Sequence, residues 1–141
     1  MKFFFDTSVL VAAISAGHIH HSPSQVAYLS ANRRNSSCAA HSLAEVYATL
    51  TRYPGKQRLT GEQALLFVEE IRTRLTVTAL DEDEYWSTIA DSARTEIIGG
   101  TIYDALIARC AVKAMATIIY TWNLDHFRRL GPEIANRVQT P

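Results

Sequence analysis

Residues 3–14 read FFFDTSVLVAAI, and this stretch decides the fold. The apolar run Lys2–Phe5 predicts a short buried strand, and the run Ser8–Ala16 predicts the helix that follows it. Gly17 stands just past the predicted helix end, a position where glycine commonly terminates a helix. Asp6 lies at the junction of strand and helix, where a buried carboxylate is costly unless it has a partner or a function. The question that the stretch raises is therefore what Asp6 does.

The rest of the chain alternates strand and helix signals, without an internal repeat or a linker. Further strands are predicted at 36–40, 76–80, 116–121 and 137–140. Helices are predicted from a capping box at Ser22, over 43–50 and ending before Pro54, from Thr60 to Arg74, from 81 to about Ile97, from Thr101 to Met115, and from about Asp125. Such alternation is typical of a parallel sheet covered on both faces. We expect a three-layer α/β/α sandwich with four or five mostly parallel strands and about seven helices.

Composition limits the class of protein. The 141 residues suit a single domain over 1–141, and 48% apolar with 20% charged residues are ordinary values for a soluble chain. The formal net charge is zero, so a nucleic-acid partner must be held by a local patch or a bound cation. The two cysteines, Cys38 and Cys110, lack metal-type spacing and predict buried free thiols in a reducing compartment. No 18-residue apolar run exists, so we expect a cytoplasmic protein without a membrane span.

Four acidic residues share one topological position, at the start of a helix beside the carboxyl end of a predicted strand. They are Asp6, Glu45, Asp104 and Asp125. Ligands bind outside the carboxyl ends of the strands in parallel sheets. Asp104 reaches this rim only if its helix runs antiparallel to the strand that it precedes, as crossover helices do.

Each acid also has a purely structural interpretation. Asp6 and Asp125 could cap the helices that follow them. Ser42-x-x-Glu45 and Thr101-x-x-Asp104 both match the pattern of a capping box. As a set the acids indicate more, because crowded carboxylates repel one another unless a divalent cation neutralises them. Carboxylates that leave room for water suit Mg²⁺ or Mn²⁺, and a metal beside helix N-termini suits hydrolysis of a phosphodiester.

Over its whole length the chain resembles the PIN-domain ribonucleases, specifically the VapC-type toxins of toxin–antitoxin pairs. The segments that carry the resemblance are FFFDTSVLVAAI, SLAEVYATLTRYP, GGTIYDALIARCA, TIIYTWNLDHF and the closing VQTP. The resemblance implies Mg²⁺- or Mn²⁺-dependent endonucleolytic cleavage of RNA, a homodimer, and inhibition by a small VapB-like antitoxin. It also implies that the four acids form the catalytic quartet.

The resemblance further implies a role for each site residue. Asp6 and Asp104 would hold the main cation with help from Asp125, and Glu45 would ligate through water or orient the attacking water. The supporting or substrate-contacting positions are Thr7, Ser8, Thr121 and Asn123. A metal-activated water would leave a 5′-phosphate and a 3′-hydroxyl, so preference for RNA must come from the groove and from contacts to the 2′-hydroxyl.

Other features leave alternatives open. His18, His20 and His21 could bind zinc or act as an acid–base group, or could form a polar loop at a helix start. Arg52–Arg58 and Arg128-Arg129 are candidates for contacting RNA phosphates or an acidic stretch of the antitoxin. A haloacid-dehalogenase-like phosphatase is one rival, but it needs Asp-x-Asp where this chain has Ser8. A catalytically inactive PIN-like module that only binds RNA or protein is another, and the presence of all four acids argues against it.

Overall fold

The computed structural model describes the whole chain, Met1–Pro141, as a parallel sheet between two groups of helices. The strands are β1 (Phe3–Phe5), β2 (Ser36–Ala39), β3 (Thr76–Thr78), β4 (Ile118–Tyr120) and β5 (Val138–Gln139). Their order is β3-β2-β1-β4-β5, and every neighbouring pair is parallel. The predicted α/β sandwich is therefore confirmed, with β1 at the centre of the sheet.

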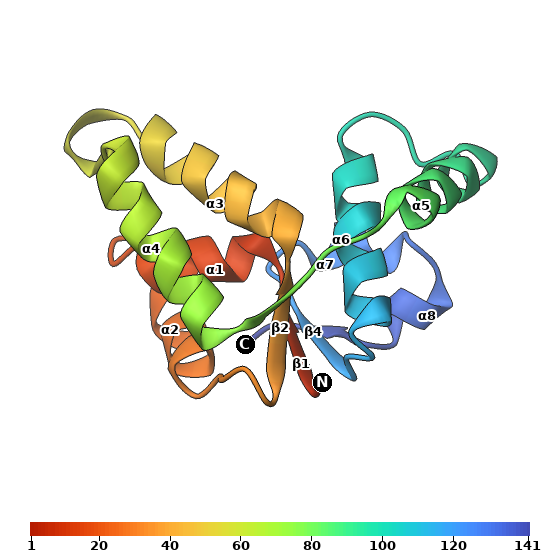
Figure 1. Cartoon of the computed structure of the whole chain (residues 1–141), viewed down its shortest axis with the longest axis horizontal. Helices are drawn as coiled ribbons and strands as arrows, with labels where there is room; N and C mark the ends of the chain where they lie inside the picture. The colour runs from red at the N-terminus through yellow and green to blue at the C-terminus, as the bar shows by residue number, and fades with distance from the viewer.

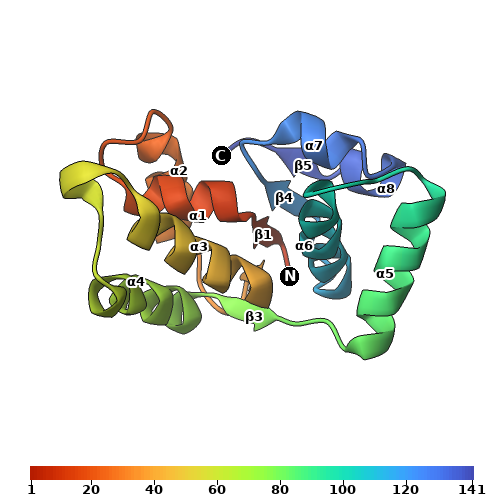
Figure 2. The same cartoon turned by 90° about the horizontal axis from the view of Figure 1, so that it is seen from above.

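Eight α-helices and one 3₁₀ turn connect the strands. They are α1 (Thr7–Ile14), α2 (His21–Leu29), α3 (Ala40–Arg52), η1 (Gly55–Gln57), α4 (Gly61–Arg74), α5 (Glu82–Arg94), α6 (Thr101–Lys113), α7 (Leu124–Arg128) and α8 (Pro132–Ala135). Helices α1 to α4 cover one face of the sheet, while α6, α7 and α8 cover the other and α5 packs outside α6 (Figures 1 and 2). None of these helices is long and apolar enough to cross a bilayer.

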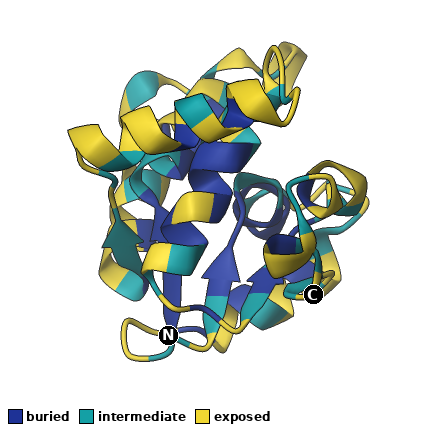
Figure 3. Cartoon of the chain, turned by 90° about the vertical axis from the view of Figure 1, so that its right-hand side faces the viewer, coloured by how far each residue is buried: buried dark blue, intermediate teal, exposed yellow.

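The phenylalanines of β1 explain why two hydrophobic cores form. Side chains alternate across a strand, so Phe5 faces the core beneath α1 to α4 and Phe4 faces the core beneath α6 to α8. Both rings are almost wholly buried, and the inner strands of the sheet lie in the buried centre of the molecule, whereas β3 at one edge is half-buried (Figure 3). Cys38 and Cys110 are buried and unpaired, as predicted.

Helix ends follow local sequence signals in some places and not in others. Thr60 and Asp81 each form a full capping box, with Gln63 and Glu84 respectively. The box predicted at Ser22 is wrong, because α2 begins at His21 and His20 is its N-terminal flanking residue. Helix α5 ends at Arg94, before the predicted Ile97. There Glu96 takes a left-handed backbone with φ of 57°.

The route of the chain brings the carboxyl ends of the strands to one rim. Asp6 ends β1, and its N–H still donates to Tyr120 O of β4 at 3.0 Å, so the two strands end side by side. Helix α3 starts directly after β2, with no loop between them. Helix α6 runs back toward the start of β4 (Figure 1), which leaves its first turn, and hence Asp104, at the same rim.

Candidate functional site

A cavity of about 490 Å³ opens at this rim, and three of the four predicted acids line it. Asp6, Glu45 and Asp104 share its lining with Thr7 and Ser8. These residues come from the junction of β1 and α1, from α1 itself, and from α3 and α6, so the fold gathers them from distant parts of the chain. The prediction that Asp104 reaches the rim on an antiparallel helix agrees with this geometry.

Asp6 is both a helix cap and the most deeply buried acid of the cavity. Its side chain is 2% exposed, and Oδ2 accepts the hydroxyl hydrogen bonds of Ser8 at 2.7 Å and of Thr121 at 2.8 Å. The Ser8 backbone N–H also reaches Oδ2, at 3.3 Å. Burial raises the pKa of Asp6, and the hydrogen bonds from Ser8 and Thr121 oppose that rise. Because both hydroxyls bind Oδ2, Oδ1 is left free of hydroxyl donors.

Glu45 is held by a hydroxyl rather than by its own helix. The Thr7 hydroxyl donates to Glu45 Oε1 at 2.8 Å, and Thr7 Oγ1 lies 2.9 Å from the buried Ser42 Oγ. The predicted Ser42–Glu45 capping box is wrong, because α3 begins at Ala40 with no side-chain cap. Helix α3 continues straight from β2, so Ser42 lies inside its first turn and turns toward Thr7 instead. Thr7 therefore holds Glu45 in place, and its predicted role in supporting catalysis stays a prediction.

The charges of the other two acids act on the pKa of Asp104. The pKa of Asp104 is raised to about 6, mainly by burial, next by the negative charge of Asp6, and to a smaller degree by that of Glu45. His126 opposes these effects, with Nδ1 at 3.4 Å from Asp104 Oδ2. The alternative capping box with Thr101 does not form, since α6 begins after Gly100 without a side-chain cap.

Asp125 stands apart from the other three acids. It lies exposed in the first turn of α7 and is not part of the cavity lining. It does not cap α7 through its side chain, because that helix is flanked by Asn123 with no capping hydrogen bond. Its neighbour His126 is the residue of α7 that contacts Asp104. The assistance to a cation that was predicted for Asp125 stays a prediction.

The polar positions near the end of β4 support Asp6 from the other side. Thr121 is fully buried and receives the Asn123 backbone N–H at 3.0 Å while its own hydroxyl binds Asp6. Asn123 lines the cavity. Both positions were predicted to be supporting, and their placement follows from β4 lying beside β1.

The donor set fits a hydrated cation better than a cage of protein ligands. No three histidine, cysteine, aspartate or glutamate side chains lie close enough together to bind one metal ion directly. Mg²⁺ usually keeps several water ligands and binds through one or two carboxylates. Two acids with raised pKa values in one cavity, Asp6 and Asp104, have the charge that such an ion would neutralise.

Sequence reasoning missed two groups at the site. The sequence places His126 next to Asp125, which is compatible equally with a surface position and with a contact to substrate, yet in the structure it pairs with Asp104. The ring of His20 stacks on Trp122 beside the acids, with centroids 3.7 Å apart. The only sequence signal for His126 is its position next to Asp125. No sequence signal indicates that residue 20 contacts residue 122.

Comparisons with known proteins identify a family model and several similar proteins. The PIN domain family model matches residues 3–131. Ribonuclease VapC40 of Mycobacterium tuberculosis is 32% identical over 114 residues, which is 81% of each chain. Ribonuclease VapC27 of the same organism is 32% identical over 80% of this chain and 79% of its own.

Two solved structures share the fold. The sarcin-ricin loop cleaving toxin VapC20 of Mycobacterium tuberculosis has a TM-score of 0.71 at 21% identity and covers 89% of this chain and 92% of its own. VapBC2 of Rickettsia felis, bound to a DNA fragment from its promoter, has a TM-score of 0.64 at 19% identity over 99% of this chain and 98% of its own. At these identities the likeness concerns the fold alone.

Proposed function

Because the chain belongs to the PIN-domain family and, within it, to the VapC ribonucleases, we propose that it cleaves RNA internally as the toxin of a toxin–antitoxin pair. The proposed cofactor is Mg²⁺ or Mn²⁺, held by Asp6 and Asp104 with assistance from Asp125. The proposed catalytic set is completed by Glu45. A single PIN-like domain over residues 1–141 is proposed with it.

One observation carries this proposal, namely the convergence of three carboxylates on one cavity with two of their pKa values raised. A raised pKa means that the surroundings disfavour the charged form. Without a function, such crowding costs stability and gains nothing. A divalent cation relieves it, and when bound supplies an activated water and neutralises charge on the phosphate.

The protein's own groups have separate tasks around that chemistry. Ser8 and Thr121 hold Asp6 in one orientation through Oδ2, which leaves Oδ1 free of hydroxyl donors. Thr7 fixes Glu45, and a glutamate so held is suited to orient the attacking water and take its proton. The attack would leave a 5′-phosphate on one fragment and a 3′-hydroxyl on the other.

The partners follow from the family and from a second cavity. An apolar cavity of about 470 Å³ adjoins the acidic one, is lined by Ile14, Leu50, Tyr53 and Phe67, and shares His18 with it. This continuity supports inhibition by a VapB-like antitoxin whose segment crosses both cavities. A homodimer and a cytoplasmic location are proposed on the family resemblance.

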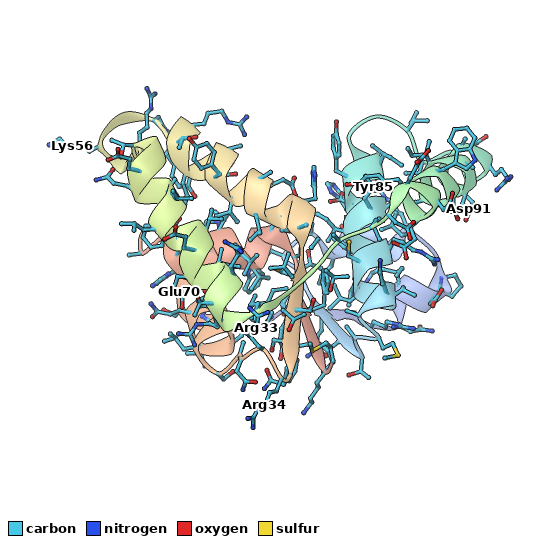
Figure 4. The ribbon with its side chains drawn as sticks, in the orientation of Figure 1. Arg33, Arg34, Lys56, Glu70, Tyr85 and Asp91 are labelled. Atoms are coloured by element: carbon cyan, nitrogen blue, oxygen red, sulfur yellow. The ribbon has the colours of Figure 1, made fainter.

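The experiment that tests the function compares the loss of a carboxylate inside the cavity with the loss of a carboxylate outside it. Asp6→Asn removes a cavity carboxylate, while Asp91→Asn removes an exposed one on α5 that does not line the cavity (Figure 4). Wild-type protein and Asp91→Asn should cleave single-stranded RNA when Mn²⁺ is added, and Asp6→Asn should not. Equal cleavage by all three would contradict the assignment. RNA binding without any cleavage by the wild type would favour the inactive binding module.

A further inference from the structure

A group of aromatic residues lines the same cavity as the acids. We call His18, His20 and Trp122 the aromatic wall; all three belong to the cavity lining. The imidazole of His20 lies flat on the indole of Trp122, with centroids 3.7 Å apart and planes 7° apart. His18 lies next to them, its ring centroid 5.7 Å from that of His20.

Hydrogen bonds hold this wall in a fixed position relative to Asp6. Trp122 Nε1 donates to the buried Ser24 Oγ at 2.8 Å, which fixes the indole plane. The Trp122 backbone N–H donates to Ser8 Oγ at 3.0 Å, and that hydroxyl donates to Asp6 Oδ2. One hydroxyl therefore links the wall to the acid, so the distance between stacked ring and carboxylate cannot vary freely.

The His20 ring has no partner for its polar edge. Its imidazole takes part in no hydrogen bond and no ion pair, although it is only partly exposed. Its backbone N–H donates to His18 Nδ1 at 3.0 Å, which puts the proton of neutral His18 on Nε2. Burial, and then the charges of His20 and His21, lower the pKa of His18, so the neutral donor form is favoured. An unstacked nucleobase can stack on such a flat ring and accept a hydrogen bond from the neighbouring N–H donor.

We propose that the His20–Trp122 stack is a platform on which one base of the RNA lies beside the scissile phosphate, with His18 Nε2–H as a donor to the same nucleotide. This inference rests on the proposed nuclease function and adds a residue that positions the substrate. The platform reads no particular base by itself, because every base has a face that can stack. Its consequence is that the enzyme requires an unpaired nucleotide next to the cleaved bond.

The proposal predicts a specific coupling between protein and RNA. Loss of one stacked base weakens binding by about tenfold, within the range measured for aromatic platforms. His20→Ala should cause this loss, and His20→Phe, which keeps a flat ring, should not. His21→Ala is the matched control, because His21 follows His20 directly as the first residue of α2 but binds Ala12 O and does not line the cavity.

The test scans an abasic nucleotide through a fluorescent single-stranded RNA of eight nucleotides. Binding is measured by anisotropy in the Asp104→Asn background, so that it does not depend on cleavage. In the protein with His20 intact, and in the His21→Ala and His20→Phe variants, one abasic position should weaken binding about tenfold. In the His20→Ala variant the same abasic position should have no effect, since base and platform act as one pair. Melting curves establish that each variant is folded.

The outcomes separate the two proposals. An abasic penalty that persists in the folded His20→Ala variant, or the absence of any abasic penalty with His20 intact, overturns the platform. Absence of RNA cleavage by the wild-type protein with Mn²⁺ overturns the nuclease function instead. In wild-type cleavage assays, His20→Ala should raise KM about tenfold and leave kcat within a factor of two, whereas a general loss of folded protein would lower kcat at constant KM.

Discussion

The hydroxyl of Thr121 donates a hydrogen bond of 2.8 Å to Oδ2 of Asp6, across 115 positions of sequence and with both side chains buried. The bond exists because β1 and β4 are adjacent parallel strands that end side by side. The pairing of β1 with β4 therefore both buries Asp6 and orients its carboxylate.

Thr121→Val should damage the site with little change in shape. The variant removes a donor to a buried carboxylate, which raises the pKa of Asp6 further and leaves Oδ2 held by Ser8 alone. A hydrogen bond to a charged group is worth about 1.5–3 kcal/mol, so we expect a loss of roughly tenfold or more in kcat with Mn²⁺. Single-turnover cleavage measures the effect. Thr51→Val, which removes an exposed hydroxyl on α3, is the control and should cleave at the wild-type rate.

Mn²⁺ should stabilise the folded protein. At 100 times Kd a bound ligand adds about 2.7 kcal/mol, which for a domain of this size is a Tm increase of roughly 10 °C. Asp6→Asn and Asp104→Asn should each reduce the increase, because each removes a charge that faces the ion. Thermal melts with and without Mn²⁺ measure it, and Asp91→Asn should keep the full shift. A melting temperature that does not respond to millimolar Mn²⁺ would refute the cation site.

Without metal, the Asp104 carboxylate should make the protein less stable as pH rises. Its pKa in the folded state, about 6, lies above the ordinary value of 3.8, so the folded state binds the proton more tightly than the unfolded state. Stability therefore falls between about pH 4 and pH 6 and stays low above that range. Asp104→Asn should remove this loss and stabilise the metal-free protein at pH 7.5 by up to about 3 kcal/mol.

Urea unfolding in EDTA at pH 4 and pH 7.5 measures that difference. The two proteins should differ by less than about 1 kcal/mol at pH 4, where the carboxyl group is protonated in the folded chain and only about half ionised in the unfolded chain. If Asp104→Asn were less stable than the wild type at pH 7.5, the carboxylate would be a stabilising group, and the electrostatic account of the site would be wrong.

Asp125→Asn should reduce cleavage less than Asp104→Asn does. Asp125 is exposed and outside the cavity lining, so its assistance would act through water. We expect the loss in kcat/KM to be at least tenfold smaller for Asp125→Asn than for Asp104→Asn, because a contact through water is weaker than direct binding of the ion. Rates for both variants at saturating Mn²⁺ decide the matter. Equal losses would mean that α7 moves Asp125 into the site when the ion binds.

The sequence predicted the sheet and most of the site because their signals are local. A phenylalanine run, an Asp at its end and a helix directly afterwards describe β1, the cap and α1 without reference to the rest of the chain. The capping box at Thr60 was equally readable, because both partners lie within one turn, and the acidic run from Asp81 marked the start of α5, although its capping box was not predicted. The same local pattern misled at Ser42, because a helix that continues directly from a buried strand needs no cap of that kind.

What the sequence could not predict depends on contacts between distant segments. Helix α8 has only four residues and packs beside α7. A segment this short is about one turn, so it has no hydrophobic periodicity from which a helix could be predicted. The stack of His20 on Trp122 and the pairing of His126 with Asp104 exist only once the strands have brought their loops together. The apolar cavity beside the acids likewise needs α1, α3 and α4 in place.

The chemistry of the RNA ends distinguishes hydrolysis by a metal-activated water from cleavage by the RNA's own 2′-hydroxyl. A defined single-stranded RNA is incubated with wild-type protein and with Asp104→Asn, with Mn²⁺ and with EDTA, and the fragment ends are identified by mass spectrometry. We expect fragments with a 5′-phosphate and a 3′-hydroxyl from the wild type with Mn²⁺ and from no other mixture. Cleavage in EDTA, or 2′,3′-cyclic phosphate ends, would contradict hydrolysis by a cation held between Asp6 and Asp104.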